Sequence, residues 1–399
     1  MLKTWSILTA FVFCLVVYRF LEPDSGLPVV IAARFTIALC FLVGLLVTYY
    51  DQWGGCIVCY EPPIQEVVRY KTIALRLGLL LLLLYPCLMS IFLPSWPTAV
   101  FNFEYLLILP LLLLAVPPYV RWAESFMPSP DDAYYRMGQV VLRQRAWNWR
   151  EHKPLLLAWG VKLFFIPLMY SWLVLAVETL LDFEWVLNPA VVVAGLFVFG
   201  LSVDLLVASA GYFFASRLLN NEVKSTDATW LGWAVCLICY PPFLEFFLAI
   251  KAQRDDLAWT DWLLPNEPLY WVWAFLITAS WLVYWLSTMS FGLRFSNLSW
   301  RGLVDSGPYR YTKHPAYISK NIYWWLHTVP FVGVADGMDL LRNVLGLSFV
   351  SGVYYLRART EERHLLAFSE YVEYAEKIRR DGLLARISRL FRQRPECCE

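Results

Sequence analysis

Hydrophobic residues follow one another along this chain in long blocks that short polar segments separate. The blocks are rich in leucine and show no alternation of apolar and polar positions, so strands are not expected. They are as long as the roughly 20 apolar residues that a helix needs to cross a bilayer, where an unpaired backbone is costly. The pattern predicts an all-α polytopic membrane protein with about ten transmembrane helices, at residues 5–21, 27–50, 73–93, 99–120, 154–181, 188–217, 230–250, 268–292, 318–334 and 339–356.

The composition agrees with a chain that exposes much of its surface to lipid. Hydrophobic residues make up 59% of the 399 residues and charged residues 16%, against roughly 25% charged in an ordinary soluble domain. The net charge of +1 provides no overall basic field, so nucleic acid is not an expected partner. The nine cysteines lie scattered, without the spacing of a disulfide framework.

Lysine and arginine are concentrated in alternate loops. The segments 121–153 and 294–313 and the tail after residue 357 are basic, whereas intervening loops carry acids such as Asp182 and Asp261. Cytoplasmic loops of membrane proteins are enriched in basic residues. The asymmetry predicts that both the N-terminus and the C-terminus lie in the cytoplasm.

The long loop at 121–153 divides the predicted spans into unequal groups. We expect an N-terminal transmembrane region of about four helices at 1–153, an additional transmembrane helix at 154–187, and a membrane domain with a C-terminal cytoplasmic helix at 188–399. The loop is rich in tryptophan and basic near its end, which is typical of a segment lying at the membrane interface. The N-terminal helices either wall a substrate entrance or form a dimer face; the sequence does not determine the oligomeric state.

Two polar stretches in the last third of the chain carry the candidate chemistry. Residues 306–317 read Ser-Gly-Pro-Tyr-Arg-Tyr-Thr-Lys-His-Pro-Ala-Tyr and place cations, hydroxyls and an imidazole in a loop between two predicted spans. Residues 357–374 begin where the last predicted span ends. Within them Arg357 and Glu361 are four residues apart and share a helix face. The loop is a suitable place for a polar, charged cofactor.

Together these stretches resemble the isoprenylcysteine carboxyl methyltransferase and phospholipid methyltransferase superfamily. Its pattern is a Gly-x-Tyr…Arg-His-Pro-x-Tyr loop, a short transmembrane hairpin, Arg-x-x-x-Glu-Glu-x-x-Leu and a closing Tyr-x-x-Tyr. The matching residues of this chain are Gly307, Tyr309, His314, Pro315, Tyr317, Arg357, Glu361, Glu362, Leu365, Tyr371 and Tyr374. Lys313 stands where the pattern has arginine, and the Phe-Gly that usually precedes the final tyrosines is absent. The resemblance covers about residues 190–399.

The resemblance implies a five-helix methyltransferase-like core in the C-terminal half. It implies S-adenosylmethionine (SAM) as methyl donor, an active site at the cytoplasmic face, and a lipidic or lipid-attached acceptor that arrives from the membrane. The glycine-rich turn of soluble dinucleotide-type folds is missing from this chain. Methylation of a carboxylate, as in prenylcysteine, is the first hypothesis for the reaction, and methylation of a phospholipid amine is the second.

The same resemblance assigns roles to individual residues, and none of them is a metal ligand. It makes Arg357 and Glu362 the catalytic candidates, which position the acceptor or the amino-acid part of the cofactor. The residues that it implies for binding SAM are Gly307, Tyr309, Lys313, His314, Pro315, Tyr317 and Glu361.

Three other interpretations of the chain stay open. One is a reductase of the sterol-reductase type that uses NADPH. A second is a transporter or membrane scaffold without enzymatic activity, which inverted repeats with broken helices would support. The third takes the basic loop residues as plain anchors on the cytoplasmic side.

Ionisable residues inside predicted spans are further candidates, because they are costly in lipid and usually functional or paired. Asp204 and Glu245 are expected to line the cavity, with a salt bridge between Lys162 and Asp204 as the alternative. His152 and His364 are expected to be solvated. The pairs Cys56/Cys59 and Cys236/Cys239 lack the partners of a metal or redox site and are interpreted as structural.

Overall fold

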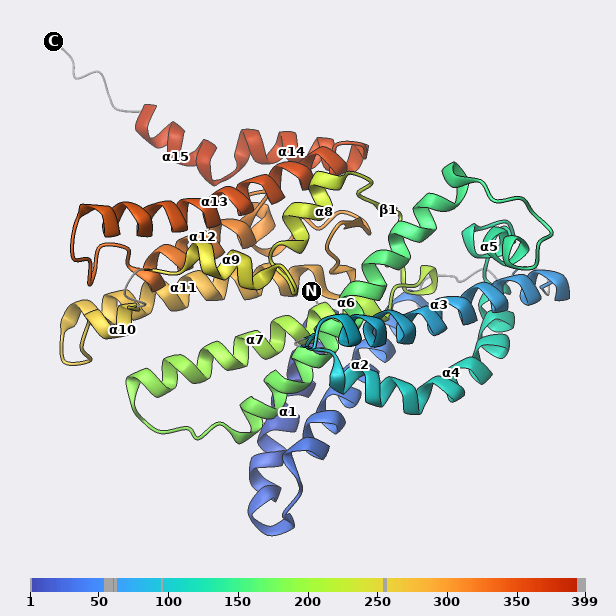
Figure 1. Ribbon diagram of the computed structural model, residues 1–399, viewed down its shortest axis with the longest axis horizontal. Helices are drawn as coiled ribbons and strands as arrows, with labels where there is room; N and C mark the ends of the chain where they lie inside the picture. Colours follow the sequence, from blue (N-terminus) through green and yellow to red (C-terminus); the bar gives the residue numbers. More distant parts are fainter. Residues whose placement is uncertain (1, 54–59, 61–62, 95, 254–256, 393–399) are drawn as a thin grey trace.

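Helices form nearly all of the regular structure, which confirms the predicted all-α polytopic fold (Figure 1). The computed structural model describes residues 2–53, 60, 63–94, 96–253 and 257–392. The helices of the first half are α1 (Leu2–Ser25), α2 (Val29–Trp53), α3 (Gln65–Phe92), α4 (Ala99–Glu124), α5 (Ala133–Val141), α6 (Trp149–Asp182) and α7 (Pro189–Phe213).

The second half has shorter helices and two short strands. Its α-helices are α8 (Trp230–Leu237), α9 (Leu244–Lys251), α10 (Trp259–Trp262), α11 (Pro268–Phe291), α12 (Pro315–Thr328), α13 (Gly337–Leu365), α14 (Ser369–Asp381) and α15 (Leu383–Arg392). Between them lie the 3-10 turns η1 (Arg217–Leu219), η2 (Gly292–Arg294) and η3 (Gly307–Arg310), and the antiparallel pair β1 (Ser225–Thr226) and β2 (Ser299–Trp300).

Seven helices of the described residues are long and apolar enough to cross a membrane: α1, α2, α3, α4, α6, α7 and α11. The other three predicted spans have different shapes. The segment 230–250 breaks into α8 and α9 at Pro241 and Pro242, since proline cannot donate the helical hydrogen bond. Segment 318–334 falls largely in the 14-residue α12, and 339–356 forms the first part of α13.

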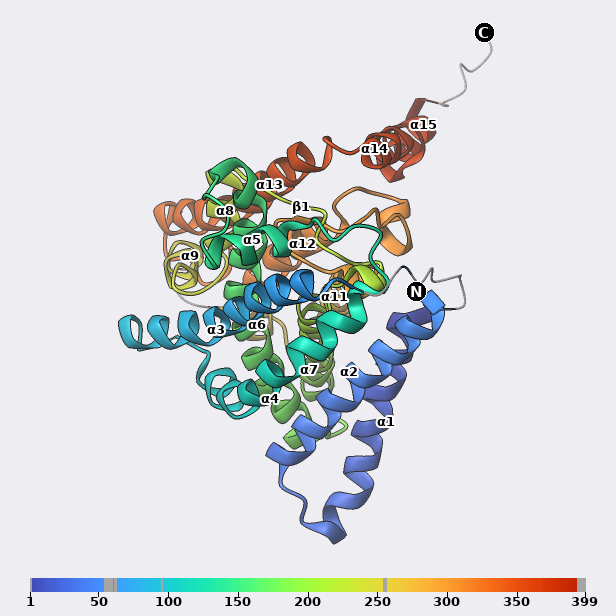
Figure 2. The same cartoon turned by 90° about the vertical axis from the view of Figure 1, so that its right-hand side faces the viewer.

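The long helix α6 lies at the centre of the molecule and packs against α2, α3, α4 and α7 (Figure 1). One continuous apolar core runs from α1 through α6 into α7 and η2, and includes Phe11, Phe165, Leu206 and Leu293. The hairpin of α1 and α2 packs against α6, and its connecting end extends beyond the remaining helices (Figure 2). The predicted division of the chain at 153 and 187 therefore lies within a shared core, and it remains a prediction.

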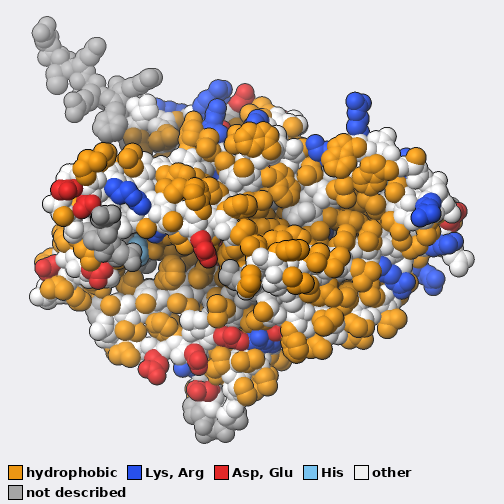
Figure 3. Space-filling model, viewed as in Figure 1, with side chains coloured by type: hydrophobic (Ala, Val, Ile, Leu, Met, Phe, Trp, Pro, Cys, Tyr) orange, Lys and Arg blue, Asp and Glu red, His pale blue; other side chains and the backbone are white. Residues whose placement is uncertain are grey.

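Charged side chains tie the N-terminal helices together within this apolar region. Arg34 of α2 forms ion pairs with Glu104 of α4, at 2.9 Å, and with Glu178 of α6. An ionised group in lipid is tolerated when an opposite charge meets it. The face seen in Figure 3 is otherwise covered mainly by hydrophobic side chains, as expected of a surface in contact with lipid.

The long loop after α4 is anchored by a buried lysine. Lys71 of α3, whose side chain is 3% exposed, lies 2.7 Å from the carboxylate of Glu124 and 2.8 Å from that of Asp132. His152, predicted to be solvated, is instead buried at the start of α6, where Nδ1 lies 2.7 Å from the carbonyl oxygen of Asn148. That prediction was wrong because the tryptophan-rich loop folds back and Trp147 stacks on the imidazole ring.

Candidate active site

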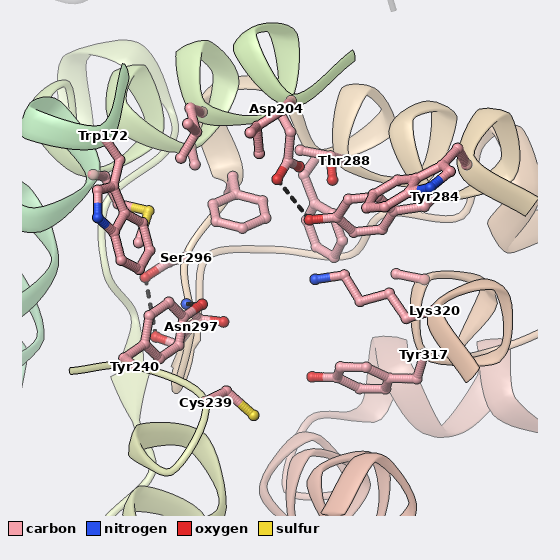
Figure 4. A pocket seen from close by; sticks show the side chains of 18 of the residues that line it. Trp172, Asp204, Cys239, Tyr240, Tyr284, Thr288, Ser296, Asn297, Tyr317 and Lys320 are labelled. Carbon is pink, nitrogen blue, oxygen red and sulfur yellow. Dashed lines mark hydrogen bonds between the residues drawn. The ribbon is translucent and has the colours of Figure 1, made fainter. Parts of the chain in front are cut away.

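A cavity of about 570 Å³ lies between α6, α7, α11, α12 and α13 (Figure 4). Helix α6 contributes Trp172 and Thr179, so a helix outside the predicted methyltransferase-like region forms one wall. The opposite wall carries side chains of the 306–317 loop and of the 357–374 stretch. Two stretches that are about 40 residues apart in sequence thus meet at one end of a single cavity.

The loop before α12 is held in place by the C-terminal tail. Gly307 begins η3 with φ +61°, a left-handed conformation that glycine adopts without strain. The hydroxyl of Tyr374 donates to the carbonyl oxygen of Tyr309 at 2.8 Å, and Tyr371 packs in the same cluster. The backbone N–H of Leu383 donates to the carbonyl oxygen of Tyr311. The two closing tyrosines therefore fasten the loop that enters the site.

A buried arginine shapes the other approach to the cavity. Arg301 is 3% exposed, and its guanidinium donates to the carbonyl oxygens of Asn221, Gly211 and Phe295 at 2.6–2.9 Å. Burial lowers the pKa of Arg301 to about 10. A side chain at Gly211 would lie 2.5 Å from the carbonyl oxygen of Phe295, so only glycine allows α7 to approach this loop. The contacts position Ser296 and Asn297 at the cavity wall.

Glu362 holds the two residues that precede α12. Its carboxylate lies 3.1 Å from Nε2 of His314 and also forms an ion pair with Lys313. Arg359 lies 3.7 Å away on the exposed side. Hydrogen bonding from His314 and then from Lys313 lowers the pKa of Glu362 from 4.5 to about 2. Glu362 is thus ionised at neutral pH and orients the loop from behind.

This ion cluster predicts an acid-dependent loss of stability. Because the pKa of Glu362 is lowered by folding, its stabilisation is complete above pH 4.5 and is lost as the pH falls towards 2. We expect the free energy of unfolding of Glu362→Gln to be about 1–3 kcal/mol lower than that of the wild type at neutral pH. This difference should disappear as the pH falls from 4.5 towards 2. Thermal unfolding in detergent as a function of pH measures it.

The control for this experiment is Glu373→Gln, since Glu373 is an exposed residue of α14. Its profile should follow that of the wild type, and its activity should be far less affected than that of Glu362→Gln. Equal effects of the two substitutions would contradict a specific role of Glu362 in the loop.

Arg357 lies at the junction between the loop and the deeper cavity. The side chain is buried, donates to Oδ1 of Asn297 at 3.1 Å, and places its guanidinium 5.4 Å from the ring centroid of Tyr317. Asn297 in turn donates to the hydroxyl of Tyr240 at 3.1 Å (Figure 4). Glu361 lines the same wall one helical turn further on. The arrangement presents a fixed cation and a carboxylate side by side.

A polar group occupies the far side of the cavity. Asp204 of α7 accepts a hydrogen bond from Tyr284 of α11 at 2.6 Å, and Lys320 of α12 lies 4.1 Å over the ring of Tyr284 (Figure 4). Asp204 lines the cavity as predicted, and its oxygen contacts Tyr284 rather than Lys162. Glu245 is an exposed residue of α9 and is not part of the wall, so that prediction was wrong. The break at Pro241 and Pro242 turns it outward.

The remaining wall of the cavity is apolar and reaches the outer surface of the helices. Leu175 and Thr179 of α6 are exposed, Leu175 to 61%, and both line the cavity with Val198 and Leu201 of α7. Exposed apolar side chains on a helix that is long and apolar enough to cross a membrane suit contact with lipid. The cavity therefore joins a charged end to an apolar end that suits contact with lipid.

A second, polar cavity of about 60 Å³ adjoins the first beside Arg357 and Glu361. It also contains His364, whose Nε2 lies 2.9 Å from the hydroxyl of Ser225, and Asp227. His364 is partly buried rather than solvated as predicted, and this burial lowers its pKa. Ser225 of β1 covers this side of the imidazole.

Comparison with known families adds one finding to this geometry. Residues 271–367 match the isoprenylcysteine carboxyl methyltransferase (ICMT) family. The matched stretch begins in α11 and ends just after α13, so it contains the loop, α12 and Arg357 to Glu362. Neither the curated proteins nor the solved structures gave a significant match. The ICMT-family match supports a membrane methyltransferase, in an integral membrane protein with seven candidate spans among the described residues.

The structure brings most of the predicted site residues of the matched stretch together. The residues that line the cavity are Tyr309, Lys313, His314, Tyr317, Arg357 and Glu361. Gly307, Pro315 and Glu362 lie behind this wall and support it: Gly307 and Pro315 begin η3 and α12, and Glu362 binds the loop.

Sequence reasoning missed Asn297, Tyr240, Tyr284 and Lys320. Of these only Lys320 had a signal, as a lysine inside a predicted apolar span. Cys236 and Cys239 lie near the site, but the described residues contain no group able to hold a metal ion; Cys56 and Cys59 are outside them.

Proposed function

We propose that this protein is a SAM-dependent methyltransferase of the ICMT type, acting on a lipidic or lipid-attached acceptor. One observation carries the proposal: a single cavity has the motif residues at one end and an apolar, lipid-facing wall at the other. A charged donor and an apolar acceptor need this combination if they are to meet out of water.

The residues at the charged end suit the groups that SAM presents. A buried guanidinium, Arg357, can pair with the carboxylate of its amino-acid part, and Glu361 can accept hydrogen bonds from its amino or hydroxyl groups. The rings of Tyr309 and Tyr317 offer flat surfaces for its adenine. In the adjoining polar cavity the hydroxyl of Ser299 is buried without a partner, as in a site built for a polar ligand.

The acceptor would enter from the membrane side. Leu175, Val198 and Leu201 offer an apolar path for a hydrocarbon chain between α6 and α7. The head of the acceptor would then lie near Arg357 and His314. This proposal makes α6, which lies outside the matched segment, part of the acceptor site.

The reaction asks mainly for positioning. SAM supplies an electrophilic methyl group, and a carboxylate acceptor needs no proton removed before it attacks. Holding two reactants in line in a dry site is worth roughly 7–11 kcal/mol. We propose carboxyl O-methylation ahead of amine N-methylation, because the cavity wall carries Lys320 as a cation besides Arg357, and cations attract a carboxylate and repel an ammonium group.

We further propose that the loop end of the cavity faces the cytoplasm. The basic segments 121–153 and 294–313 and the basic tail support this orientation. It gives a soluble, charged cofactor direct access while the acceptor stays in lipid.

Ligand binding by the purified protein in neutral detergent tests the proposal. We expect saturable SAM binding in isothermal titration calorimetry and no binding of NADPH. Binding of NADPH alone would favour a reductase. Binding of neither ligand would remove the support for an enzyme and favour a transporter or scaffold.

A further inference from the structure

Lys320 is a cation inside the cavity that the ICMT-type motif does not include. It follows Tyr317 by three residues, in the first half of α12, and its side chain points into the cavity between Tyr284 and Tyr317 (Figure 4). Six residues along α12 correspond to roughly 9 Å, so Lys320 lies well beyond the level of His314. It belongs to the part of the cavity away from the loop.

The ammonium group of Lys320 lacks a hydrogen-bond acceptor in the described part of the chain. Its recorded contact is the ring of Tyr284, 4.1 Å from Nζ. The other two cations of the wall each have a polar side-chain partner: Lys313 pairs with Glu362, and Arg357 donates one hydrogen bond to Asn297. Lys320 is therefore the cation of this wall that has neither a hydrogen bond nor an ion pair among the described residues.

Asp204, the acid that lines this side of the cavity, does not neutralise Lys320 by an ion pair. Asp204 uses Oδ2 to accept from Tyr284 at 2.6 Å, and its Oδ1 is buried without a hydrogen-bond partner. The two charges attract each other across the cavity but do not form an ion pair among the described residues. The ammonium group of Lys320 and Oδ1 of Asp204 thus both lie at the cavity with unused hydrogen-bonding capacity.

A lysine held this way is unfavourable unless something anionic binds it. The attraction between a cation and an aromatic ring offsets only part of the hydration free energy that the cation loses on leaving water. Charged groups within membrane spans are, for this reason, usually paired or functional. The neighbouring wall is apolar, from Leu201 to Leu175 and Trp281, so the ligand that meets Lys320 must carry hydrocarbon as well as charge.

We propose that Lys320 forms an anion-binding subsite for the methyl acceptor, so that the acceptor is a lipid with an acidic group, a carboxylate or a phosphate. This inference rests on the proposed function only in identifying the bound lipid as the methyl acceptor. The binding of an acidic lipid can be measured without methyl transfer. Tyr284 and Tyr317 flank the subsite, and the hydroxyl of Tyr284 stays engaged with Asp204. Lys320 is then a residue that determines specificity, separate from Arg357.

The first measurement is the thermal stability of Lys320→Met without ligand, in dodecyl maltoside. If Lys320 is an unsatisfied cation kept for a ligand, its removal should raise the melting temperature by about 2–4 °C. Lys162→Met, a lysine of α6 outside the cavity wall, is the matched control and should not gain stability. A lower melting temperature for Lys320→Met would show a structural role and overturn the proposal.

The second measurement titrates oleic acid, dioleoyl phosphatidate and oleyl alcohol into the same samples. We expect one or both acids, but not the alcohol, to stabilise the wild type and Lys320→Arg, and Lys320→Met to bind them about 10-fold more weakly or worse. Stabilisation by oleic acid alone would identify the anionic group of the ligand as a carboxylate, and stabilisation by phosphatidate alone would identify it as a phosphate. Equal stabilisation by the alcohol, or undiminished acid binding by Lys320→Met, would overturn the proposal.

A SAM titration of Lys320→Met separates this inference from the proposed function. Lys320 lies roughly 9 Å beyond His314 along α12 and is not among the residues proposed to bind SAM, so the variant should bind SAM as the wild type does. Absence of SAM binding in both proteins would refute the methyltransferase while leaving the acidic-lipid result intact.

Discussion

Replacing Arg357 with alanine should lower methyl transfer by about 10²–10³-fold, the range for one lost donor aimed at reacting groups. Arg357 is buried, and its guanidinium is fixed by Asn297 and by the ring of Tyr317. Its removal leaves Oδ1 of Asn297 without its donor and takes away the group proposed to hold a carboxylate. Transfer of labelled methyl from SAM into organic-extractable lipid, in membranes containing the protein, measures the loss without an identified acceptor.

Two further variants make this result specific. Arg359→Ala removes a cation two residues away whose side chain is 64% exposed, and it should stay within about 2-fold of the wild type. Arg357→Lys should recover only part of the activity, because lysine keeps the charge but loses the planar fork. Similar losses for Arg357→Ala and Arg359→Ala would refute an active-site role for Arg357.

Replacing His314 with alanine should abolish measurable SAM binding, while membrane insertion stays normal. His314 lines the cavity, lies 3.1 Å from Glu362 and stacks against Tyr317 at 5.8 Å between ring centroids. The substitution removes a polar wall residue and frees Glu362 and Tyr317 to move, so binding and preorganisation are lost together. Calorimetry measures SAM affinity, and extraction from membranes measures insertion.

The matched control is His327→Ala, near the end of α12, the helix that begins directly after His314. His327 packs against Tyr323 and Trp324 and is not part of the cavity wall. It should keep wild-type affinity for SAM even if stability falls. Wild-type affinity in His314→Ala would break the assignment of the loop to the cofactor.

The predictions that succeeded share a physical cause. Long apolar blocks must become helices in lipid, and seven of the ten predicted spans are helices of the required length and hydropathy. The motif residues could be recognised in the sequence because their conformations depend on nearby residues. Gly307 and Pro315 set a turn and a helix start, and Arg357 and Glu361 share a helix face. Such features depend on neighbours within a few residues.

The predictions that failed required knowledge of distant segments. Glu245 was expected in the cavity, but the helix break at Pro241 and Pro242 redirects it outward, by an angle that the sequence does not specify. His152 and His364 were expected in water because their sequence neighbours are charged. Trp147 covers the first, and strand β1 supplies Ser225 to the second. Burial is a property of the packed chain, so polarity along the sequence did not reveal it.

By itself, the sequence determined a helical membrane protein and the two stretches that make its charged site, since hydropathy over 20 residues and turn chemistry act locally. Only the tertiary structure decided that α6 walls the cavity, that Asn297 orients Arg357, and that Lys320 faces the same space without an acceptor among the described residues. These relations join segments far apart in the sequence, since Asn297 lies 60 residues before Arg357 and α6 ends more than 120 residues before the 306–317 loop. They arise from how helices pack side by side rather than from any pattern along one of them.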